Sequence, residues 1–418
     1  MLFLTLREIL AWCSVALGIY FVYFGVVALL GLVRKAPAVG RCKPKTRFAC
    51  VVAARNEAAV IGQLVDSLRA QDYPEDLYEI IVAPNNCTDS TEAVAAAHGA
   101  RIFHPQGIIR SKGEVLTQVV DEIVLKEPFD AMCVFDADNL ASRQFLANMN
   151  DALCAGAGVV QGFRDSKNPE QTAISGCYSI CYWMLNRFYN GARSALGLSA
   201  LVNGSGFAVT ARLLRQLGGW HTVTMTEDYE FSAQCALAGQ RVHFAPGAVI
   251  YDEQPLTFAQ SWRQRRRWTT GSLQGLQEYG WPLFRQALVR HSGVCLDMFL
   301  TFLMPFASLA GAVLGALSVG PMLIGGSLVL GRFVLKGLAA VLLLGAGAFV
   351  LSILGTGLAA LVTVLLKKGS VAGMWRGVCS FWVFALSQTV LTLLSFVHKE
   401  TSWKPIAHTS AKNLSDLE

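Results

Sequence analysis

The stretch 131–139 reads AMCVFDADN, an apolar run that ends in Asp136 and Asp138. The run predicts a buried β-strand over Ala131–Phe135. Side chains two positions apart on an extended chain point the same way, so both carboxylates can face one ligand. A hard divalent cation such as Mg²⁺ or Mn²⁺ binds one or two carboxylates together with phosphate oxygens. The plainer alternative is a helix cap, because Ser142 follows closely.

Short apolar runs alternate with helical patterns on both sides of this stretch. Strands are also predicted at Phe48–Ala54 and Glu79–Ala83, and helices at Ala58–Ala70, Thr88–His98, Ser111–Leu125 and Ser142–Ala155. Such alternation predicts an α/β domain with a mainly parallel sheet. In these sheets ligands bind beyond the carboxyl ends of the strands.

Polar clusters follow two more of the predicted strands. Ala54-Arg55-Asn56-Glu57 ends the first, and the second ends in a stretch that begins at Asn85 and closes with Asp89. Lys112 opens a helix, where an ammonium and the helix N-terminus can hold a diphosphate. An exposed lysine on a loop more often has no such role.

Three clusters follow further along the chain. They are Asn203-Gly204-Ser205, Thr226-Glu227-Asp228 and Gln264-Arg265-Arg266-Arg267-Trp268. The glycine lets the backbone approach a ligand, although a plain turn also explains it. The acidic pair can complement a helix dipole or supply a general base. The last segment can lie at lipid headgroups or line the place where donor and acceptor meet.

The chain carries several segments long enough to cross a bilayer. Ile9–Val33, Val294–Val319 and Gly337–Leu366 are predicted spans, Val378–Val397 is a weaker one, and Pro321–Leu335 is a short helix or a loop. The first is too long for the apolar core of a signal peptide. Basic residues from Arg34 to Arg47 follow it, which predicts a cytosolic soluble domain and a multi-pass protein of the cell (inner or plasma) membrane.

Composition narrows the function further. Apolar residues make up 53% and charged residues 15% of the chain, with a net charge of +6. No dense basic face with stacking aromatics appears, which argues against nucleic-acid binding. The 11 cysteines are odd in number and irregular in spacing. We therefore expect free thiols in a reducing compartment.

The domain organisation follows from these patterns. We expect a first membrane helix over 1–35, a cytosolic catalytic domain over 44–255 and amphipathic interface helices over 256–292. A membrane region of three to four spans over 293–398 and a polar tail over 399–418 complete the chain. An odd number of spans after the catalytic domain would export the tail.

Together and in this order, the polar clusters resemble the motifs of family-2 glycosyltransferases with a GT-A fold. They look most like the membrane-integrated synthases of cellulose, chitin, hyaluronan and bacterial exopolysaccharides, over about Phe48 to Trp268. The resemblance implies an inverting hexosyltransferase. It would use a nucleotide sugar, normally a UDP-sugar, with Mg²⁺ or Mn²⁺, and extend a β-linked polysaccharide.

Residue roles are carried over from the resemblance. The donor nucleotide and diphosphate would lie against Ala54, Arg55, Glu57, Asn85, Lys112, Asp136 and Arg267, and the metal on Asp136 and Asp138. Asp228 would be the general base beside Glu227, and the acceptor would lie against Asn203, Gly204, Ser205, Gln264 and Trp268. Asn85 departs from the family, which usually has an aspartate there, so the identity of the nucleobase in the donor is less constrained.

Two alternatives remain at this point. One is transfer of a single sugar to a polyprenyl phosphate or glycolipid, and the other is a transporter or receptor whose soluble domain senses a nucleotide. Few charged residues occur in the spans, which argues against an ion or substrate pathway. Membrane lipids are expected partners, and a homo-oligomer or a separate export partner is left open.

Overall fold

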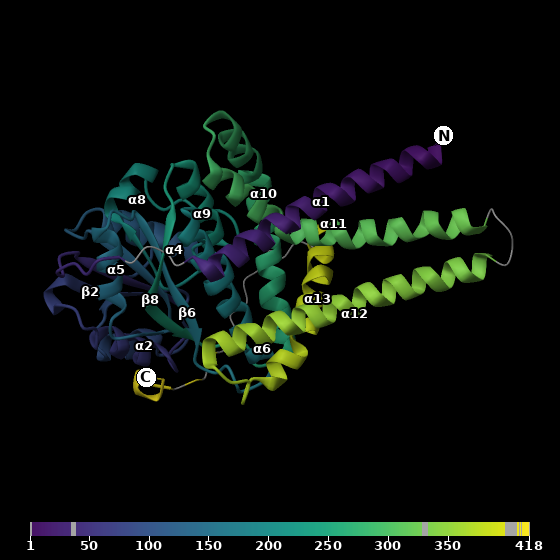
Figure 1. Cartoon of the computed structure of the whole chain (residues 1–418). Helices are drawn as coiled ribbons and strands as arrows, with labels where there is room; N and C mark the ends of the chain where they lie inside the picture. Colours follow the sequence, from purple (N-terminus) through teal and green to yellow (C-terminus); the bar gives the residue numbers. More distant parts are fainter. Residues whose placement is uncertain are drawn as a thin grey trace.

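The computed structural model describes residues 2–34, 39–327, 333–397, 408, 410 and 412–417, with side chains left out at 2–7, 316–327 and 333–349. A catalytic-type α/β domain lies at one end, and long helices project from it (Figure 1). The α/β class and the helices on both flanks confirm the fold predicted from the sequence.

One sheet forms the centre of the domain. Its strands are β1 Phe48–Ala54, β2 Tyr78–Pro84, β3 Arg101–Ile102, β4 Ala131–Asp136, β5 Leu140–Ala141, β6 Val159–Ser166, β7 Phe207–Thr210 and β8 Val242–Asp252, in the order β3-β2-β1-β4-β7-β6-β8-β5. Strands β3, β2, β1 and β4 run parallel, and β6 runs parallel to β8. Strand β7 is antiparallel to β4 and β6, and β5 to β8.

Helices cover both faces of this sheet. They are α2 Ile61–Arg69, α3 Thr91–Ala97, α4 Lys112–Val119, α5 Phe145–Cys154, α6 Ala173–Met184, α7 Ala192–Leu196, α8 Ala211–Leu217 and α9 Glu227–Leu237. Alternate residues of β1 feed two separate cores: Phe48 packs with α2 and α5, whereas Val51 packs with the Trp220 and Phe231 side. The buried strands therefore hold their carboxyl ends rigidly.

Long apolar helices flank the domain. They are α1 Leu2–Val33, α11 Gly293–Ser327, α12 Phe333–Lys368 and α13 Trp375–Val397. The 32-residue helix α10 Phe258–Val289 directly precedes α11. By length and composition, 4 described segments could cross a membrane: Glu8–Val33, Gly293–Gly315, Val350–Lys368 and Trp375–Val397. Of the doubtful 321–335 stretch, 321–327 ends α11 and 333–335 opens α12, while the expectation at 328–332 falls outside the described residues.

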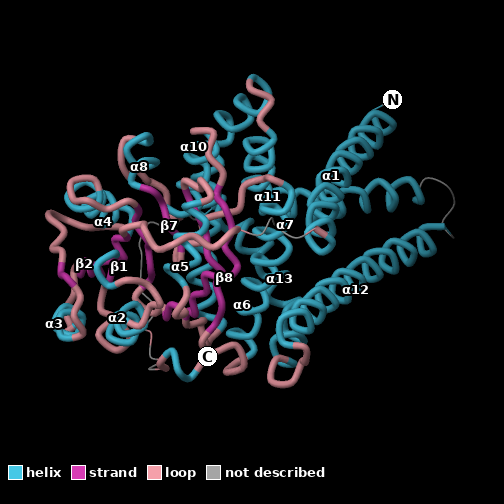
Figure 2. The backbone as a smooth tube through the Cα atoms, turned by 60° about the vertical axis from the view of Figure 1, so that its left-hand side comes forward, coloured by secondary structure: helices cyan, strands magenta, loops and turns pink. Residues whose placement is uncertain are grey.

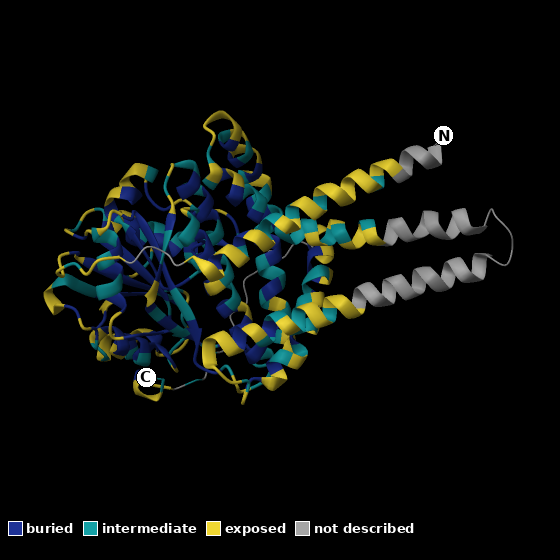
Figure 3. Ribbon diagram, viewed as in Figure 1, coloured by how far each residue is buried: buried dark blue, intermediate teal, exposed yellow. Residues whose placement is uncertain are grey.

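The last apolar helix lies differently from the others. Helices α1, α11 and α12 project away from the domain, whereas α13 crosses near their base and packs on α6 and α10 (Figures 1 and 2). In the parts of the projecting helices whose burial is described, large apolar side chains such as Trp12 and Leu351 are exposed (Figure 3). Such surfaces suit a lipid environment.

The expectation that every cysteine is free is wrong. Cys42 and Cys154 form a disulfide, and the other cysteines are free. The cause is local, because the segment after α1 lies along α5. Asp151 accepts the Cys42 N–H at 2.7 Å, and Asn150 Oδ1 accepts the Thr46 N–H at 3.2 Å. The pair is 112 residues apart, so spacing gave no sign of it.

Candidate active site

Asp136 stands where β4 ends, in the middle of the sheet. Its N–H donates to Ser205 Oγ at 2.9 Å and to Asn139 Oδ1 at 3.1 Å. Its carboxylate Oδ1 lies 2.5 Å from the Lys112 ammonium, which also donates to Gly204 O at 2.6 Å. Burial alone would raise the pKa of Asp136, but the adjacent cations outweigh it and lower the pKa. Asp136 is thus held ionised at the strand end.

Asp138 lies deeper and meets two segments from far along the chain. Its Oδ2 accepts the Glu253 N–H at 3.1 Å and lies 3.8 Å from His408 Nε2. The other ring nitrogen of His408 is 3.0 Å from Glu57. Burial disfavours the charged imidazole, but Asp138 and Glu57 outweigh burial and raise the pKa of His408 to about 10. His408, which follows all four candidate membrane helices in the chain, therefore contacts Asp138 and Glu57.

Asp136 and Asp138 suit a divalent cation that is bound partly by the protein and partly by a substrate. Among the described residues, no group of three or more His, Cys, Asp or Glu side chains is arranged to hold an ion alone. Asp136 and Asp138 supply hard oxygens, and Mg²⁺ or Mn²⁺ in such sites completes its shell with water and phosphate oxygens. The residues fit a metal held jointly with a diphosphate.

Asp228, the second residue of α9, faces the same region. A Cβ built on Gly204 would lie 3.4 Å from Asp228 Oδ2, and Gly204 has φ +78°. The Tyr229 N–H donates to Asp228 Oδ1 at 2.8 Å. Burial, followed by the Glu227 charge, raises the pKa of Asp228 to about 7. This carboxyl is poised to exchange a proton near neutral pH.

Helix α10 packs against the start of α9, which carries Asp228. Gly271 lets α10 approach the residue before α9, because a Cβ at this position would lie 2.5 Å from Thr226 Oγ1. Four residues earlier, Arg267 donates from Nη1 to Met225 O at 2.9 Å. The Arg267 charge opposes the rise in the pKa of Asp228. The structure thus places the Arg267 charge close enough to Asp228 to act on its pKa.

The rest of the 264–268 segment mainly joins elements. Arg265 is buried and donates to Phe384 O and Ser387 Oγ of α13, each at 2.8 Å. Trp268 packs edge-on against Tyr178 of α6, with ring centroids 5.9 Å apart. Within the described residues Gln264 Oε1 is buried without a hydrogen bond.

The predicted acceptor residues of the 203–205 turn are divided in their roles. Asn203 Nδ2 is buried and has no hydrogen-bond partner among the described residues. Ser205, by contrast, is engaged within the protein, where its hydroxyl bridges Asp136 N and Asn139 Oδ1. Ser205 shapes the strand end rather than offering a free hydroxyl.

The predicted nucleotide residues follow the ends of β1 and β2. Asn85 Nδ2 donates to Ala54 O at 3.1 Å, which ties the two strand ends together. Asn56 adopts φ 57° and accepts the Thr88 N–H at 2.7 Å. Arg55 lies between these contacts in sequence and follows Ala54 directly. These bonds build the rim on which a nucleotide would rest.

Sequence reasoning missed Arg164 and His408. Arg164, on β6, donates to Asn203 O at 2.5 Å and to Asp252 Oδ2 at 2.7 Å, and it stacks 4.3 Å above the Tyr182 ring. A cation in an otherwise buried strand was the available signal. His408 gave no signal, because its place depends on how the tail returns to the domain.

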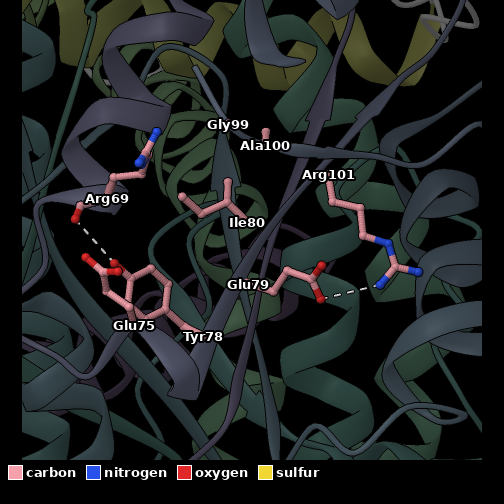
Figure 4. A pocket seen from close by; sticks show the side chains of 8 residues that line it. All are labelled: Arg69, Glu75, Tyr78, Glu79, Ile80, Gly99, Ala100 and Arg101. Atoms are coloured by element: carbon pink, nitrogen blue, oxygen red, sulfur yellow. Dashed lines mark hydrogen bonds and ion pairs between the residues drawn. The ribbon is translucent and has the colours of Figure 1, made fainter. Parts of the chain in front are cut away.

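A separate depression lies at the β3 edge of the sheet (Figure 4). It is lined by Arg69, Glu75, Tyr78, Glu79, Ile80, Gly99, Ala100 and Arg101. The Tyr78 hydroxyl donates to Arg69 O at 3.3 Å, and Arg101 lies 3.4 Å from Glu79. None of the predicted site residues lines this depression.

The profile of the glycosyltransferase-like family 2 matches residues 44–271, more than half of the chain. The chain belongs to this family. The matched segment contains each cluster described above except His408. This family-2 glycosyltransferase is therefore a transferase enzyme, as the sequence motifs predicted.

Curated relatives of the glycosyltransferase are similar over part of their length. The probable glycosyltransferase YdaM of Bacillus subtilis is 25% identical over 65% of this chain and 65% of its own. A beta-monoglucosyldiacylglycerol synthase of Synechocystis is 25% identical over 56% of this chain and 50% of its own. A poly-beta-1,6-N-acetyl-D-glucosamine synthase of Staphylococcus epidermidis is 22% identical over 56% and 57%. The chain thus spans between half and two thirds of these relatives.

One solved structure covers nearly the whole glycosyltransferase. The mannosyltransferase PcManGT of Pyrobaculum calidifontis, in complex with GDP-Man and Mn²⁺, superposes with a TM-score of 0.60 at 19% identity. The superposition covers 93% of this chain and 99% of that one. The two chains share the fold, including the helices that flank the sheet domain.

Proposed function

We propose that this glycosyltransferase moves one hexose from a nucleoside diphosphate sugar, with inversion, to an acceptor hydroxyl presented at the cytosolic face of a membrane. The observation that carries the proposal is the meeting of Asp136, Lys112 and Gly204 with Asp228 in one half-buried cluster. Donor-binding groups thereby lie on one side of a reaction centre and a carboxyl base on the other.

Asp228 takes the acceptor proton in this scheme. Its pKa of about 7 leaves a substantial ionised fraction at neutral pH. As Asp228 accepts the proton, the acceptor oxygen forms a bond to the anomeric carbon and the bond to the diphosphate oxygen breaks. One displacement inverts the anomeric centre, so an α-linked donor gives a β-linked product. General-base catalysis of this kind contributes a rate factor of about 10²–10⁴.

The leaving diphosphate meets cations already fixed in place. Lys112 and Arg267 are anchored by the backbone oxygens of Gly204 and Met225. Groups held in this way stabilise developing negative charge without reorganising. Asp136 and Asp138 would hold Mg²⁺ or Mn²⁺ against the diphosphate. When bound, the ion supplies Lewis-acid stabilisation of the departing oxygens.

A lipid-linked acceptor is supported by where the base lies. Tyr229, next to Asp228, donates from its hydroxyl to Thr301 O of α11 at 3.2 Å, so the base sits beside an apolar helix. If α11 crosses the membrane, an acceptor hydroxyl at the membrane surface would lie close to this point. The Synechocystis relative, named as a glucosyldiacylglycerol synthase, adds support.

A growing β-linked polysaccharide is the second candidate. It is favoured by the Gln264–Trp268 segment, whose Arg267 lies near Asp228, and by the similarity to a poly-N-acetylglucosamine synthase. Against it, Arg265 and Trp268 are used to pack α10 on α13 and α6.

A donor panel tests the function. The purified full chain is incubated with UDP-glucose, UDP-N-acetylglucosamine or GDP-mannose, Mn²⁺ and mixed lipid vesicles, and nucleoside diphosphate release is measured. Release with one donor and a product one sugar larger than a lipid supports the first candidate. A ladder of long products supports the second. No release with any donor and a folded protein contradicts both.

A further inference from the structure

Tyr229 links the general base to a buried ion pair outside the site described above. The pair consists of Arg193 on α7 and Asp297 at the start of α11, with Nε–Oδ2 and Nη2–Oδ1 distances of 2.8 and 3.0 Å. Both side chains are almost fully buried, at 1% and 2% exposure. A buried pair of this kind stabilises little compared with apolar packing, but it fixes the relative placement of the elements it joins.

The ion pair also holds the first membrane helix. The Tyr23 hydroxyl of α1 donates to Asp297 Oδ1 at 2.8 Å, and the Arg193 guanidinium lies 5.3 Å from the Phe24 ring centroid. Helix α1 passes close to α7 here, because a Cβ on Gly31 would collide with Ala192. Three elements far apart in sequence are therefore locked around one charge pair.

From this pair a chain of contacts leads to the base. Arg193 stacks 3.5 Å from the Tyr189 ring centroid, and the Tyr189 hydroxyl lies 2.7 Å from Thr301 Oγ1. Thr301 is one turn after Asp297 on α11 and bonds its carbonyl at 2.8 Å. Thr301 O in turn accepts the Tyr229 hydroxyl at 3.2 Å. The next contact is the Tyr229 N–H to Asp228 Oδ1.

We propose that Tyr229 is a positioning residue, which sets the place of Asp228 by anchoring the start of α9 to the Arg193–Asp297 pair and hence to α1 and α11. The inference rests on the proposed function, in which Asp228 is the base. Proton transfer requires the Asp228 carboxylate to lie within hydrogen-bonding distance of the acceptor hydroxyl. A small displacement of a catalytic group costs rate much more than it costs binding.

The chain offers a matched control for this link. The Tyr20 hydroxyl of α1 donates to Leu300 O at 2.7 Å, one residue before the carbonyl that Tyr229 uses. Both bonds join a tyrosine to a backbone oxygen of α11, but only the Tyr229 bond leads to α9. Tyr229→Phe and Tyr20→Phe each remove one hydroxyl and keep the ring, including the Tyr229–Phe302 contact at 4.3 Å.

The experiment compares steady-state kinetics of the two variants with the wild type, in vesicles, using the panel donor that gives turnover. For Tyr229→Phe we expect kcat to fall roughly tenfold while the donor KM stays within about twofold. For Tyr20→Phe we expect both constants to stay unchanged. Thermal unfolding midpoints should match between the variants, since each loses the same kind of bond.

Two results would overturn the positioning role. One is a Tyr229→Phe enzyme with wild-type kcat, and the other is an equal loss of kcat in Tyr20→Phe. Asp228→Asn, run in parallel, separates this failure from that of the proposed function. If Asp228→Asn still turns over, Asp228 is not the base, whereas an inactive Asp228→Asn with a normal Tyr229→Phe rejects the positioning role alone.

Discussion

Asp228 shows how one side chain acquires its chemistry from its surroundings. Burial and the neighbouring Glu227 raise its pKa from 3.8 to about 7, whereas Lys112 and Arg267 pull the pKa back. A carboxyl that was free in water would be ionised at neutral pH but would be a weak base. The raised pKa makes it a better proton acceptor at the pH where the cell works.

A pH profile follows from this shift. Below about pH 7 Asp228 is mainly protonated and cannot accept the acceptor proton, so kcat should fall about tenfold per pH unit on the acidic side. Asp228→Asn should lower kcat by a factor of about 10²–10⁴ and remove this acidic limb. The measurement is nucleoside diphosphate release between pH 5 and 9. An unchanged acidic limb in the variant would assign the titration to another group.

His408 gives a second prediction at the scale of a residue. Its imidazole lies between Glu57 and Asp138, so removing it leaves two neighbouring carboxylates without their shared partner. His408→Ala should change donor affinity at least severalfold and leave α9 and its base untouched. Equal donor KM values in wild type and variant would show that the tail plays no part in binding.

Sequence patterns located most of the elements that carry the site. Strand β1 was predicted with the observed bounds, because its short apolar run lies between Arg47 and Arg55 and has the length of a strand buried on both faces. The helix predicted from Ser142 begins instead at Phe145, since 140–141 pairs with β8 as β5. A two-residue strand leaves no periodicity to detect.

Elements that depend on long-range contact could not be predicted. The Cys42–Cys154 disulfide and the position of His408 both depend on segments that come together only in the folded domain. Arg164 is a partial case: a cation in a buried strand was a visible signal, but its contacts with Asn203 and Asp252 depend on the folded domain. Local sequence patterns do not reveal such long-range contacts.

The joint between α10 and α13 yields a prediction at the scale of elements. Arg265→Ala leaves Phe384 O and the Ser387 hydroxyl without their cationic donor in a buried place. We expect a loss of unfolding free energy of about 1.5–3 kcal/mol. Arg263→Ala, on an exposed position of the same helix, should change it by less than about 0.5 kcal/mol. Thermal unfolding in detergent measures both, and similar losses would contradict the assigned contacts.

At the scale of the whole molecule, the path of the chain returns the tail to the catalytic domain. Helices α11 and α12 lead away from the domain and back, and α13 crosses at their base (Figure 1). The Ser410 N–H then donates to Glu253 and the Lys412 ammonium donates to Lys167 O. The sequence alone does not decide on which side of the membrane the C-terminal tail lies, because α13 is long and apolar enough to be counted as a span.

The returning tail predicts a membrane topology. A protease-cleavable tag after Glu418 should lie on the same side as the catalytic domain, which we place in the cytosol. External protease should therefore cleave it in inside-out vesicles and leave it intact in sealed right-side-out vesicles. The N-terminus, at the far end of α1, should show the opposite pattern. Cleavage of the C-terminal tag from outside right-side-out vesicles would contradict this arrangement.

In the proposed function, one cluster binds a metal–diphosphate through Asp136 and Asp138 and holds a separate base at Asp228. Calorimetric titration of the purified chain with UDP and with GDP, each with and without Mn²⁺, tests it most directly. Asp228→Asn should bind the diphosphate as the wild type does, with the same gain from Mn²⁺, and Asp138→Ala should lose that gain. An Asp138→Ala isotherm that still strengthens with Mn²⁺ as in the wild type would contradict the account.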